Sequence, residues 1–373
     1  MAVEPGWRGR LMSIDALRGF TMFWIVGADE LVEALENIHD KGFLRNLARQ
    51  LRHKSWEGFS FYDLIFPLFL FIVGISIALS LPRHLARHGR AKTIRHILVR
   101  AAILFAFGVF YNGGMRKPLE DIRYAGVLQR IALCYAAASG LFLLLRARGI
   151  AVAVTVILLG YWALLALAPV PGYGPPTLDQ GTNLVDWLDL HYLPGSLFQP
   201  DHDPEGILST VPSVATCLLG VLVGLFLSNP AFDLRERLRD LAIAGAALVG
   251  LGFLWHLRFP IIKELWTSSF VLVSGGYSCL LLALFAWLID VRGRQRWAQP
   301  FVWLGLNSIF IYLVTNVVHF HRIAERLVGG DVDDFFDEHL IDGAGSLVAA
   351  LLTLSMVVGL AYWMHRRKIY LKV

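Results

Sequence analysis

A long apolar segment begins at Phe61 and ends at Leu81, directly after a polar connection that contains His53. A helix needs about 20 apolar residues to cross the hydrocarbon core of a bilayer, so this segment predicts a membrane span. Asp63 is its only charged residue. A titratable imidazole at the edge of a span, with carboxylates on either side, makes the stretch from His53 to Gly74 the place where we expect the chemistry.

The composition extends this interpretation to the whole chain. Its 373 residues would allow two soluble domains by length alone. However, 56% of them are hydrophobic and only 17% are charged, and several further runs approach the length of a membrane span. We therefore predict an all-α, polytopic integral membrane protein with a single transmembrane domain over residues 1–373. The net charge of +5 then gives no indication of nucleic-acid binding.

The hydropathy pattern predicts about ten transmembrane helices. Their approximate bounds are 17–31, 61–81, 94–110, 127–145, 150–170, 211–227, 238–257, 268–289, 301–318 and 347–364. Proline and glycine mark the breaks, as at Pro82. Asp29 and Glu30 follow the first helix where a signal peptide would have a small-residue cleavage site, so we predict an uncleaved first span.

The distribution of basic residues predicts the orientation. The connections on the side of the two termini carry 19 Lys and Arg residues, and the longer connections on the opposite side carry 12. Because Lys and Arg concentrate in cytoplasmic loops, both termini are predicted to be cytoplasmic.

Two outer loops depart from an even charge distribution. Residues 41–54 carry five basic groups, whereas residues 171–210 have no Lys or Arg and six carboxylates. The basic residues fit either the solvated face of a short amphipathic helix or a surface that attracts an anionic ligand or lipid headgroup. We expect the outer loops 32–60 and 171–210 to frame the entrance for a polar, amino-bearing substrate.

Charged residues at bilayer depth are costly and indicate functional sites. Asp15 and Arg18 are three residues apart at the cytoplasmic start of the first helix, where they can pair. Alternatively, Arg18 contacts a phosphate of a cytoplasmic ligand. Asp29 lies eleven residues further along, about 16 Å on a helix, and so reaches the outer half of the bilayer.

Three further polar residues lie at the spans. Asp63 opens the second span, where a carboxylate can also simply balance the helix dipole. Arg130 starts the fourth span and could pair with Asp29, Asp63 or Glu57. Asn307, inside the ninth span, fits either a ligand contact or a hydrogen bond between helices.

Metal and disulfide chemistry receive little support. Cys134, Cys217 and Cys279 lie in apolar runs without CxxC spacing, so we predict buried thiols. Two histidines at a helix end, His319 and His321, are weak evidence for a metal. We predict no metal.

Several sequence blocks together resemble the catalytic membrane region of the heparan-α-glucosaminide N-acetyltransferase family. They are SIDALRG (13–19), HxSWxG and DLIFPLFLFIVGxS (53–76), RYAGVLQR (123–130), DPEGILxTxxS (203–213), KxLWxSS (263–269), DVxG (290–293), LNSIxxY (306–312) and the final RRKIYLKV. The resemblance extends from Ser13 to the end of the chain. We expect the catalytic membrane unit alone, without the large lumenal domain of the animal members.

This resemblance implies an enzyme that transfers an acetyl group from cytoplasmic acetyl-CoA to an amino sugar across the membrane. His53 falls on the family's catalytic histidine, and Asp29 falls where the animal enzymes have an active-site asparagine. Unlike asparagine, an aspartate can hold a proton or balance an imidazolium. A homodimer and a bacterial inner membrane are further expectations.

Further candidate residues are assigned to substrate binding and to CoA binding. Candidates for substrate binding are Trp56, Asp63, Arg130, Glu205 and Asn307, and candidates for CoA binding are Arg18 and Asp15. A transporter of a sugar or cell-wall fragment is the alternative, because buried Asp and Arg residues also suit a proton-coupled carrier. An O-acyltransferase with another acceptor is a third possibility.

Overall fold

The computed structural model describes residues 11–37, 43–229, 231, 233–339 and 343–371. Within these residues all regular elements are helices, apart from three isolated β-bridges. The all-α prediction is therefore confirmed. The longer helices form a bundle, and their bounds are α1 Met12–Asn37, α3 Ile65–Tyr111, α4 Val127–Leu144, α5 Ala147–Leu167, α7 Ile207–Leu227, α8 Leu234–His256, α9 Ser268–Ala286 and α14 Ala344–Arg366.

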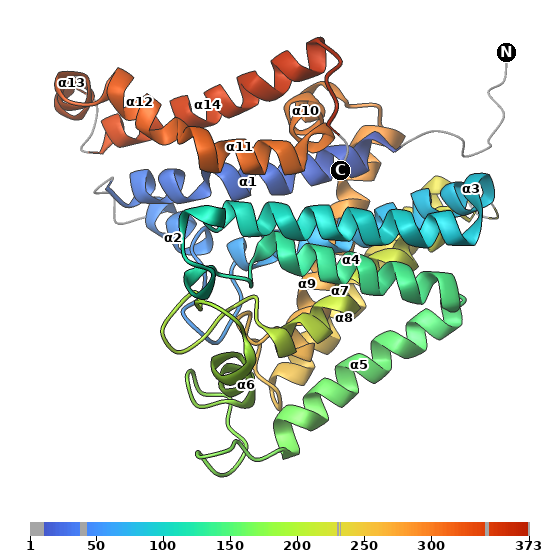
Figure 1. Cartoon of the computed structure of the whole chain (residues 1–373). Helices are drawn as coiled ribbons and strands as arrows, with labels where there is room; N and C mark the ends of the chain where they lie inside the picture. The colour runs from blue at the N-terminus through green and yellow to red at the C-terminus, as the bar shows by residue number, and fades with distance from the viewer. Residues whose placement is uncertain (1–10, 38–42, 230, 232, 340–342, 372–373) are drawn as a thin grey trace, which may run out of the picture.

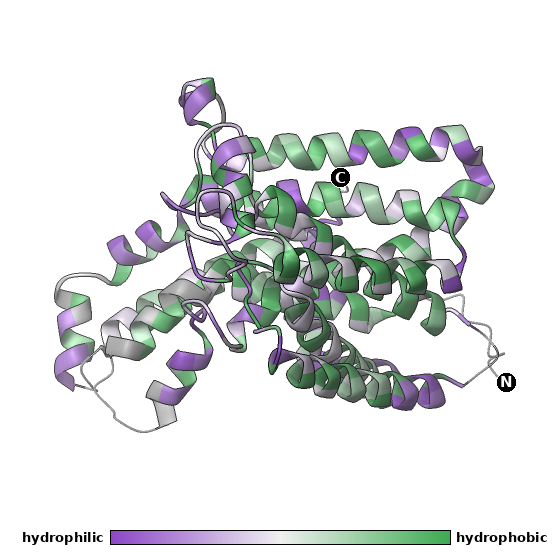
Figure 2. Cartoon of the chain, turned by 90° about the horizontal axis from the view of Figure 1, so that it is seen from below, coloured by the Kyte–Doolittle hydropathy of each residue, from purple (hydrophilic) through white to green (hydrophobic). Residues whose placement is uncertain are grey.

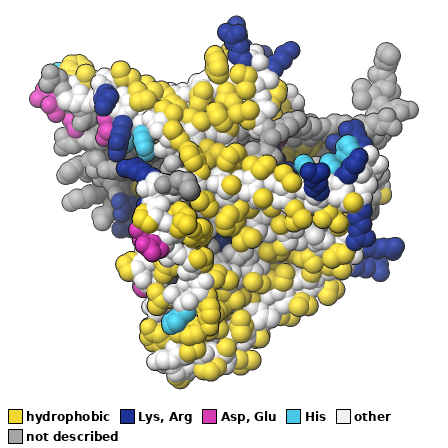
Figure 3. All heavy atoms as spheres, viewed as in Figure 1, with side chains coloured by type: hydrophobic (Ala, Val, Ile, Leu, Met, Phe, Trp, Pro, Cys, Tyr) yellow, Lys and Arg dark blue, Asp and Glu magenta, His cyan; other side chains and the backbone are white. Residues whose placement is uncertain are grey.

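Short helices gather mainly at one end of this bundle, toward the left of Figure 1. They are α2 Phe43–Gln50, α6 Leu184–Tyr192, α12 Phe320–Val328 and α13 Asp331–His339. Hydrophobic side chains cover the flank between two polar ends (Figure 3), and Figure 2 shows the hydrophobic residues along the long helices. This distribution is that of an integral membrane protein.

The expected ten spans are not confirmed. In the described part of the chain, seven helical segments are long and apolar enough to cross a membrane. An eighth results if α10 (Gln299–Leu306) and α11 (Ser308–Val318) count as one span, although a 74° bend separates them. The first predicted helix is found as α1, but its charged residues, Asp15 and Arg18 among them, exclude it from the apolar class.

The predicted helices 61–81 and 94–110 are the two arms of α3. The chain reverses between them at Gly89, which has a left-handed φ of 76°. His84 stacks on His96 with 4.5 Å between ring centroids, whereas twelve residues of straight helix would separate them by about 18 Å. Pro82, which the sequence suggested as a break, lies inside the first arm.

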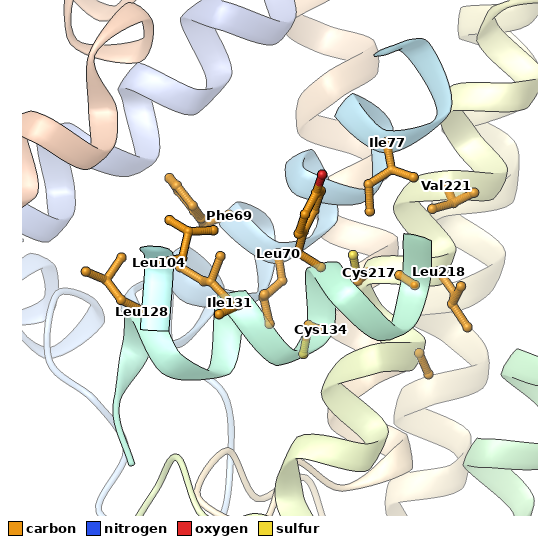
Figure 4. Packing of buried hydrophobic residues seen from close by; sticks show 14 of the residues in the cluster. Phe69, Leu70, Ile77, Leu104, Leu128, Ile131, Cys134, Cys217, Leu218 and Val221 are labelled. Atoms are coloured by element: carbon orange, nitrogen blue, oxygen red, sulfur yellow. The ribbon is translucent and has the colours of Figure 1, made fainter. Parts of the chain in front are cut away.

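Glycines allow the helices to approach closely around this hairpin. A Cβ at Gly220 of α7 would lie 1.9 Å from the carbonyl oxygen of Phe71, and a Cβ at Gly74 of α3 would lie 1.9 Å from that of Cys217. Small residues permit such backbone contact in membranes. Around it, side chains of α3, α4 and α7 fill the largest apolar cluster (Figure 4), which includes Cys134 and Cys217. All three cysteines are buried and unbonded, as predicted.

Candidate active site

His53 and Asp63 form a hydrogen-bonded pair at the start of α3. The distance from His53 Nδ1 to Asp63 Oδ1 is 2.7 Å. The Asp63 side chain is fully buried, whereas 44% of the His53 side chain is exposed. A carboxylate can only accept, so Nδ1 donates and Nε2 is left as the basic nitrogen.

The local turn holds the carboxylate rigidly. Residues Tyr62–Leu64 form a 3-10 turn, and the second oxygen of Asp63 accepts hydrogen bonds from Ser60 N at 2.9 Å and Ser60 Oγ at 2.8 Å. Tyr62 stacks on the His53 ring with 4.4 Å between centroids. The imidazole therefore has one fixed orientation and one exposed edge.

Asp63 thus has a different role from the one suggested by the sequence. We expected Asp63 either to contact the substrate or to balance the dipole of the helix that it opens. We expected Asp29 to be the partner of His53. The structure shows a hydrogen bond from His53 to Asp63, and the role expected for Asp29 stays a prediction. Asp29 belongs to α1, but its side chain lies outside the described residues.

Trp56 joins the two outer loops that were expected to frame the site. Its indole Nε1 donates to the Leu178 carbonyl at 2.9 Å, and its ring meets the edge of the His202 ring at 6.0 Å. On the other side, Gly58 N donates to the Ile261 carbonyl at 2.8 Å. The segment that carries His53 is therefore fixed by two other connections of the chain.

The carboxylates of the 171–210 loop are largely engaged within the protein. Arg123 binds both oxygens of Asp203, at 2.7 and 2.8 Å, and Glu205 at 2.6 Å. Burial disfavours the Arg123 charge, but these carboxylates raise the pKa of its guanidinium above the ordinary value. Glu205 is therefore part of an ion-pair cluster. The expectation that this loop frames an entrance stays a prediction. Arg123 was not among the predicted site residues, although it lies in the RYAGVLQR block.

Arg130 is 1% exposed and lies deep beside this loop. Its Nη2 donates to Ser209 Oγ and, at 3.4 Å, to the Gly206 carbonyl, and its guanidinium lies 5.0 Å from the Trp266 ring. No ion pair joins Arg130 to Glu57 or Asp63 among the described residues. Those two expected pairings are wrong, because the Arg130 side chain is directed toward the start of α7.

Asp189 of α6 is a buried carboxylate near Arg130. Its Oδ1 accepts the first backbone N–H of α7, from Ile207, at 2.7 Å. Burial is the main cause that raises the pKa of Asp189 to about 7, and the Arg130 charge opposes this rise.

The remaining candidates do not adjoin His53. Asp15 and Arg18 pair at 3.4 Å, as predicted, and Arg18 also donates to Ser76 of α3 at 2.7 Å. Asn307 lies at the break between α10 and α11. Its amide donates to the Ile369 carbonyl at 3.0 Å and accepts Leu371 N at 2.9 Å. Its side chain therefore binds the C-terminal segment.

In the part of the chain that the structure describes, no group of three or more His, Cys, Asp or Glu side chains could hold a metal ion. The chemistry that the site offers is that of an oriented imidazole with a buried carboxylate behind it. Such a pair serves as a general base or as an activated nucleophile.

Comparison with known proteins identifies relatives. A family model described as heparan-alpha-glucosaminide N-acetyltransferase, catalytic, matches residues 10–256. Heparan-alpha-glucosaminide N-acetyltransferase of Homo sapiens is 28% identical over 430 residues, which cover 98% of this chain and 60% of the human protein. The Mus musculus protein of the same name is 27% identical over 385 residues, covering 86% and 56%. The chain thus spans less than two thirds of the length of either relative.

Proposed function

This chain belongs to the heparan-alpha-glucosaminide N-acetyltransferase catalytic family, and we propose that it is a membrane acetyltransferase. The donor is cytoplasmic acetyl-CoA. The acceptor is the amino group of a glucosamine-type sugar on the opposite side of the membrane, which we take to be the periplasmic side of a bacterial inner membrane. The observation that carries the proposal is the hydrogen-bonded pair of His53 and Asp63. His53 is also the residue that the sequence resemblance implies is the catalytic histidine.

The chemistry of the pair suits attack of an amine on a thioester. The amine must lose a proton as its nitrogen bonds to the carbonyl carbon, and the thiolate of CoA leaves when the C–S bond breaks. Nε2 of His53 accepts that proton, and the buried Asp63 carboxylate balances the imidazolium. In a two-step variant, Nε2 itself attacks the thioester and passes the acetyl group on to the amine.

The other residues take supporting roles in this proposal. Trp56 positions the His53 segment against the loop 171–206. The cluster of Arg123, Asp203 and Glu205 orders the same loop, and Arg130 supports the start of α7. Asp29 remains a second candidate carboxylate for the acceptor. Arg18 and Asp15, at the start of α1, are proposed to lie near the CoA phosphates, since phosphates cannot enter hydrocarbon. A homodimer is the proposed assembly.

Single-turnover labelling with [acetyl-¹⁴C]acetyl-CoA tests the function. Wild type, His53→Ala and the control His191→Ala are purified in detergent and incubated with and without glucosamine. His191 is an exposed histidine of α6 that contacts Trp187, through a hydrogen bond to its carbonyl and by stacking on its ring. Label on wild type and on His191→Ala that glucosamine discharges would support an acetylated His53. Transfer to glucosamine without protein labelling would support His53 as the base. In both cases, His53→Ala should be inactive.

One observation favours a carrier as the second candidate. Broken membrane helices often form transport sites, and α10 and α11 are separated by a 74° bend at Asn307. Absence of acetyl-CoA consumption by wild type with every amino sugar tried would move this candidate ahead. Acetylation of a hydroxyl but not of an amine would instead indicate an O-acyltransferase.

A further inference from the structure

A small cavity of about 210 Å³ lies between α1, α11, α12 and α14. Its lining combines apolar side chains, Val26, Phe320 and Val357, with the polar side chains of Thr315, His319, His321, Arg322 and Thr353. Ligand pockets for drug-sized molecules measure about 300 to 1,000 Å³, so this cavity fits a group the size of a phosphate with a few further atoms. It is too small for a disaccharide or for the nucleotide of CoA.

The hydrogen-bond donors in the cavity favour an anion. The two lining hydroxyls donate to their own helices, Thr315 to the Tyr312 carbonyl and Thr353 to the Ala349 carbonyl, both at 2.9 Å. The Arg322 backbone N–H donates to the His319 carbonyl at 3.0 Å, but its guanidinium makes no hydrogen bond or ion pair with the described residues. A guanidinium binds phosphate with two parallel hydrogen bonds, so Arg322 is the principal candidate for the anion.

His321 offers a second donor. Its Nε2 lies 3.1 Å from a carboxylate oxygen of Glu325, one helical turn further along α12. The carboxylate accepts, so Nε2 carries a hydrogen. Nδ1 is buried and has no partner among the described residues. A neutral imidazole with its hydrogen on Nε2 has an acceptor at Nδ1, whereas an imidazolium donates from both nitrogens. With an anion bound in the cavity, His321 is an imidazolium that donates from Nε2 to Glu325 and from Nδ1 to the anion.

The surroundings of the cavity indicate that the anion is carried by a lipid. Val317 and Val318 at the end of α11 are 58% and 41% exposed, and Leu327 of α12 is 61% exposed. Basic, imidazole and acidic side chains lie beside hydrophobic surface at this end of the molecule (Figure 3). Exposed aliphatic side chains next to cationic ones are typical of a segment at a membrane interface.

We propose that this cavity binds the phosphate of an anionic phospholipid, with Arg322 on the phosphate oxygens, Nδ1 of His321 as a second donor and the acyl chains along α11 and α12. His319 contributes a further imidazole at the turn between these helices. The site is independent of acetyl transfer.

Native mass spectrometry of the purified protein with phosphatidylglycerol tests the proposal. Arg322→Gln should weaken phosphatidylglycerol binding about tenfold, the equivalent of one charge-assisted interaction. The matched control is Arg326→Gln, because Arg326 is exposed on the same helix but does not line the cavity. Thermal unfolding of both variants should match wild type.

Three outcomes would overturn the proposal. Equal losses for Arg322→Gln and Arg326→Gln would indicate general attraction to the cationic side chains of α12. Equal affinity for phosphatidylcholine would show that the net lipid charge is not recognised. Displacement of the lipid by inorganic phosphate at the same concentration would assign the cavity to a soluble anion.

Discussion

At the scale of single residues, Asp63 determines which nitrogen of His53 is basic. In Asp63→Asn, the backbone N–H of Ser60 still requires an acceptor at the position of Oδ2. The amide oxygen therefore occupies that position, and the NH₂ group faces Nδ1 of His53. Nδ1 must then accept, so the proton moves to Nε2 and the base is lost. We expect the rate of acetyl transfer to fall by about 10²- to 10⁴-fold.

The acetyl-transfer rate at saturating donor and acceptor measures this effect. Glu57→Gln is the control on the same loop, since the Glu57 side chain is 57% exposed and lies 3.7 Å from His256. A full rate in Asp63→Asn, with an unchanged melting temperature, would remove Asp63 from the mechanism.

A second prediction at this scale concerns Asp189 and pH. Burial raises the pKa of Asp189 from 3.8 to about 7. Between pH 3.8 and about pH 7, Asp189 therefore holds a proton in the folded state that it has released in the unfolded state. Stability from this group is complete below about pH 4 and is lost as the pH rises toward 7. Asp189→Asn keeps an acceptor for Ile207 N without the charge. The melting temperature of the variant relative to wild type should therefore increase from pH 4 to pH 7 and then level off.

Differential scanning fluorimetry of the detergent-solubilised protein gives the measurement. Asp201→Asn is the opposite control, because the hydrogen bond from His202 lowers the pKa of the exposed Asp201. Its stabilising contribution is present at neutral pH and is lost in acid. A difference between Asp189→Asn and wild type that stays constant from pH 4 to pH 8 would contradict the assignment.

At the scale of elements, the break between α10 and α11 is stabilised by the C-terminal segment. Asn307 is 1% exposed and binds the backbone of Ile369 and Leu371 through both amide atoms. Removing the amide in Asn307→Ala should release this segment, so that trypsin cleaves after Arg367 and Lys368 severalfold faster. Intact-mass analysis over time measures the cleavage.

Asn316→Ala is the matched control within α11. If the cleavage rate of Asn307→Ala equals that of wild type while its KM for donor or acceptor rises, Asn307 is a substrate ligand, as the sequence first suggested. Faster cleavage with unchanged KM values would show that Asn307 stabilises the C-terminal segment and does not bind substrate.

The same elements show what can be deduced from a sequence like this one. Hydropathy located the apolar segments, because each must be long enough to cross a bilayer. It could not locate the reversal at Gly89, since the residues from Arg83 to Arg95 look like an ordinary polar connection although helix continues on both sides of the turn. Pro82 was misleading because the helix continues through it.

The site was only partly predictable for a related reason. His53 and Asp63 both lie in the stretch where chemistry was expected, but their contact depends on the turn at Ser60 that directs the carboxylate back toward the imidazole. Pairings between distant segments, such as Arg123 with Asp203, leave no local pattern. Opposite charges 80 residues apart have many alternative partners in a sequence.

At the scale of the whole molecule, the proposed reaction requires the CoA nucleotide and the amino-sugar acceptor to approach from opposite ends of the bundle, while the thioester end of the donor reaches His53. The reversal at Gly89 carries Arg83, Arg87, Arg90 and Arg95, and Figure 3 shows basic side chains gathered at this end. His53 and the loop 171–206 belong to the other end, from which α3 begins. The positive-inside rule then predicts that the Gly89 reversal faces the cytoplasm.

Cysteine labelling in intact spheroplasts tests this orientation. His88→Cys marks the reversal, Tyr173→Cys marks the opposite loop, and both positions are exposed. The three native cysteines are buried, which keeps the background low. A membrane-impermeant maleimide should label Tyr173→Cys directly and His88→Cys only after permeabilisation. The reverse pattern would place His53 on the cytoplasmic side, where amine and acetyl-CoA meet without crossing a membrane, and the transmembrane part of the proposed reaction would be wrong.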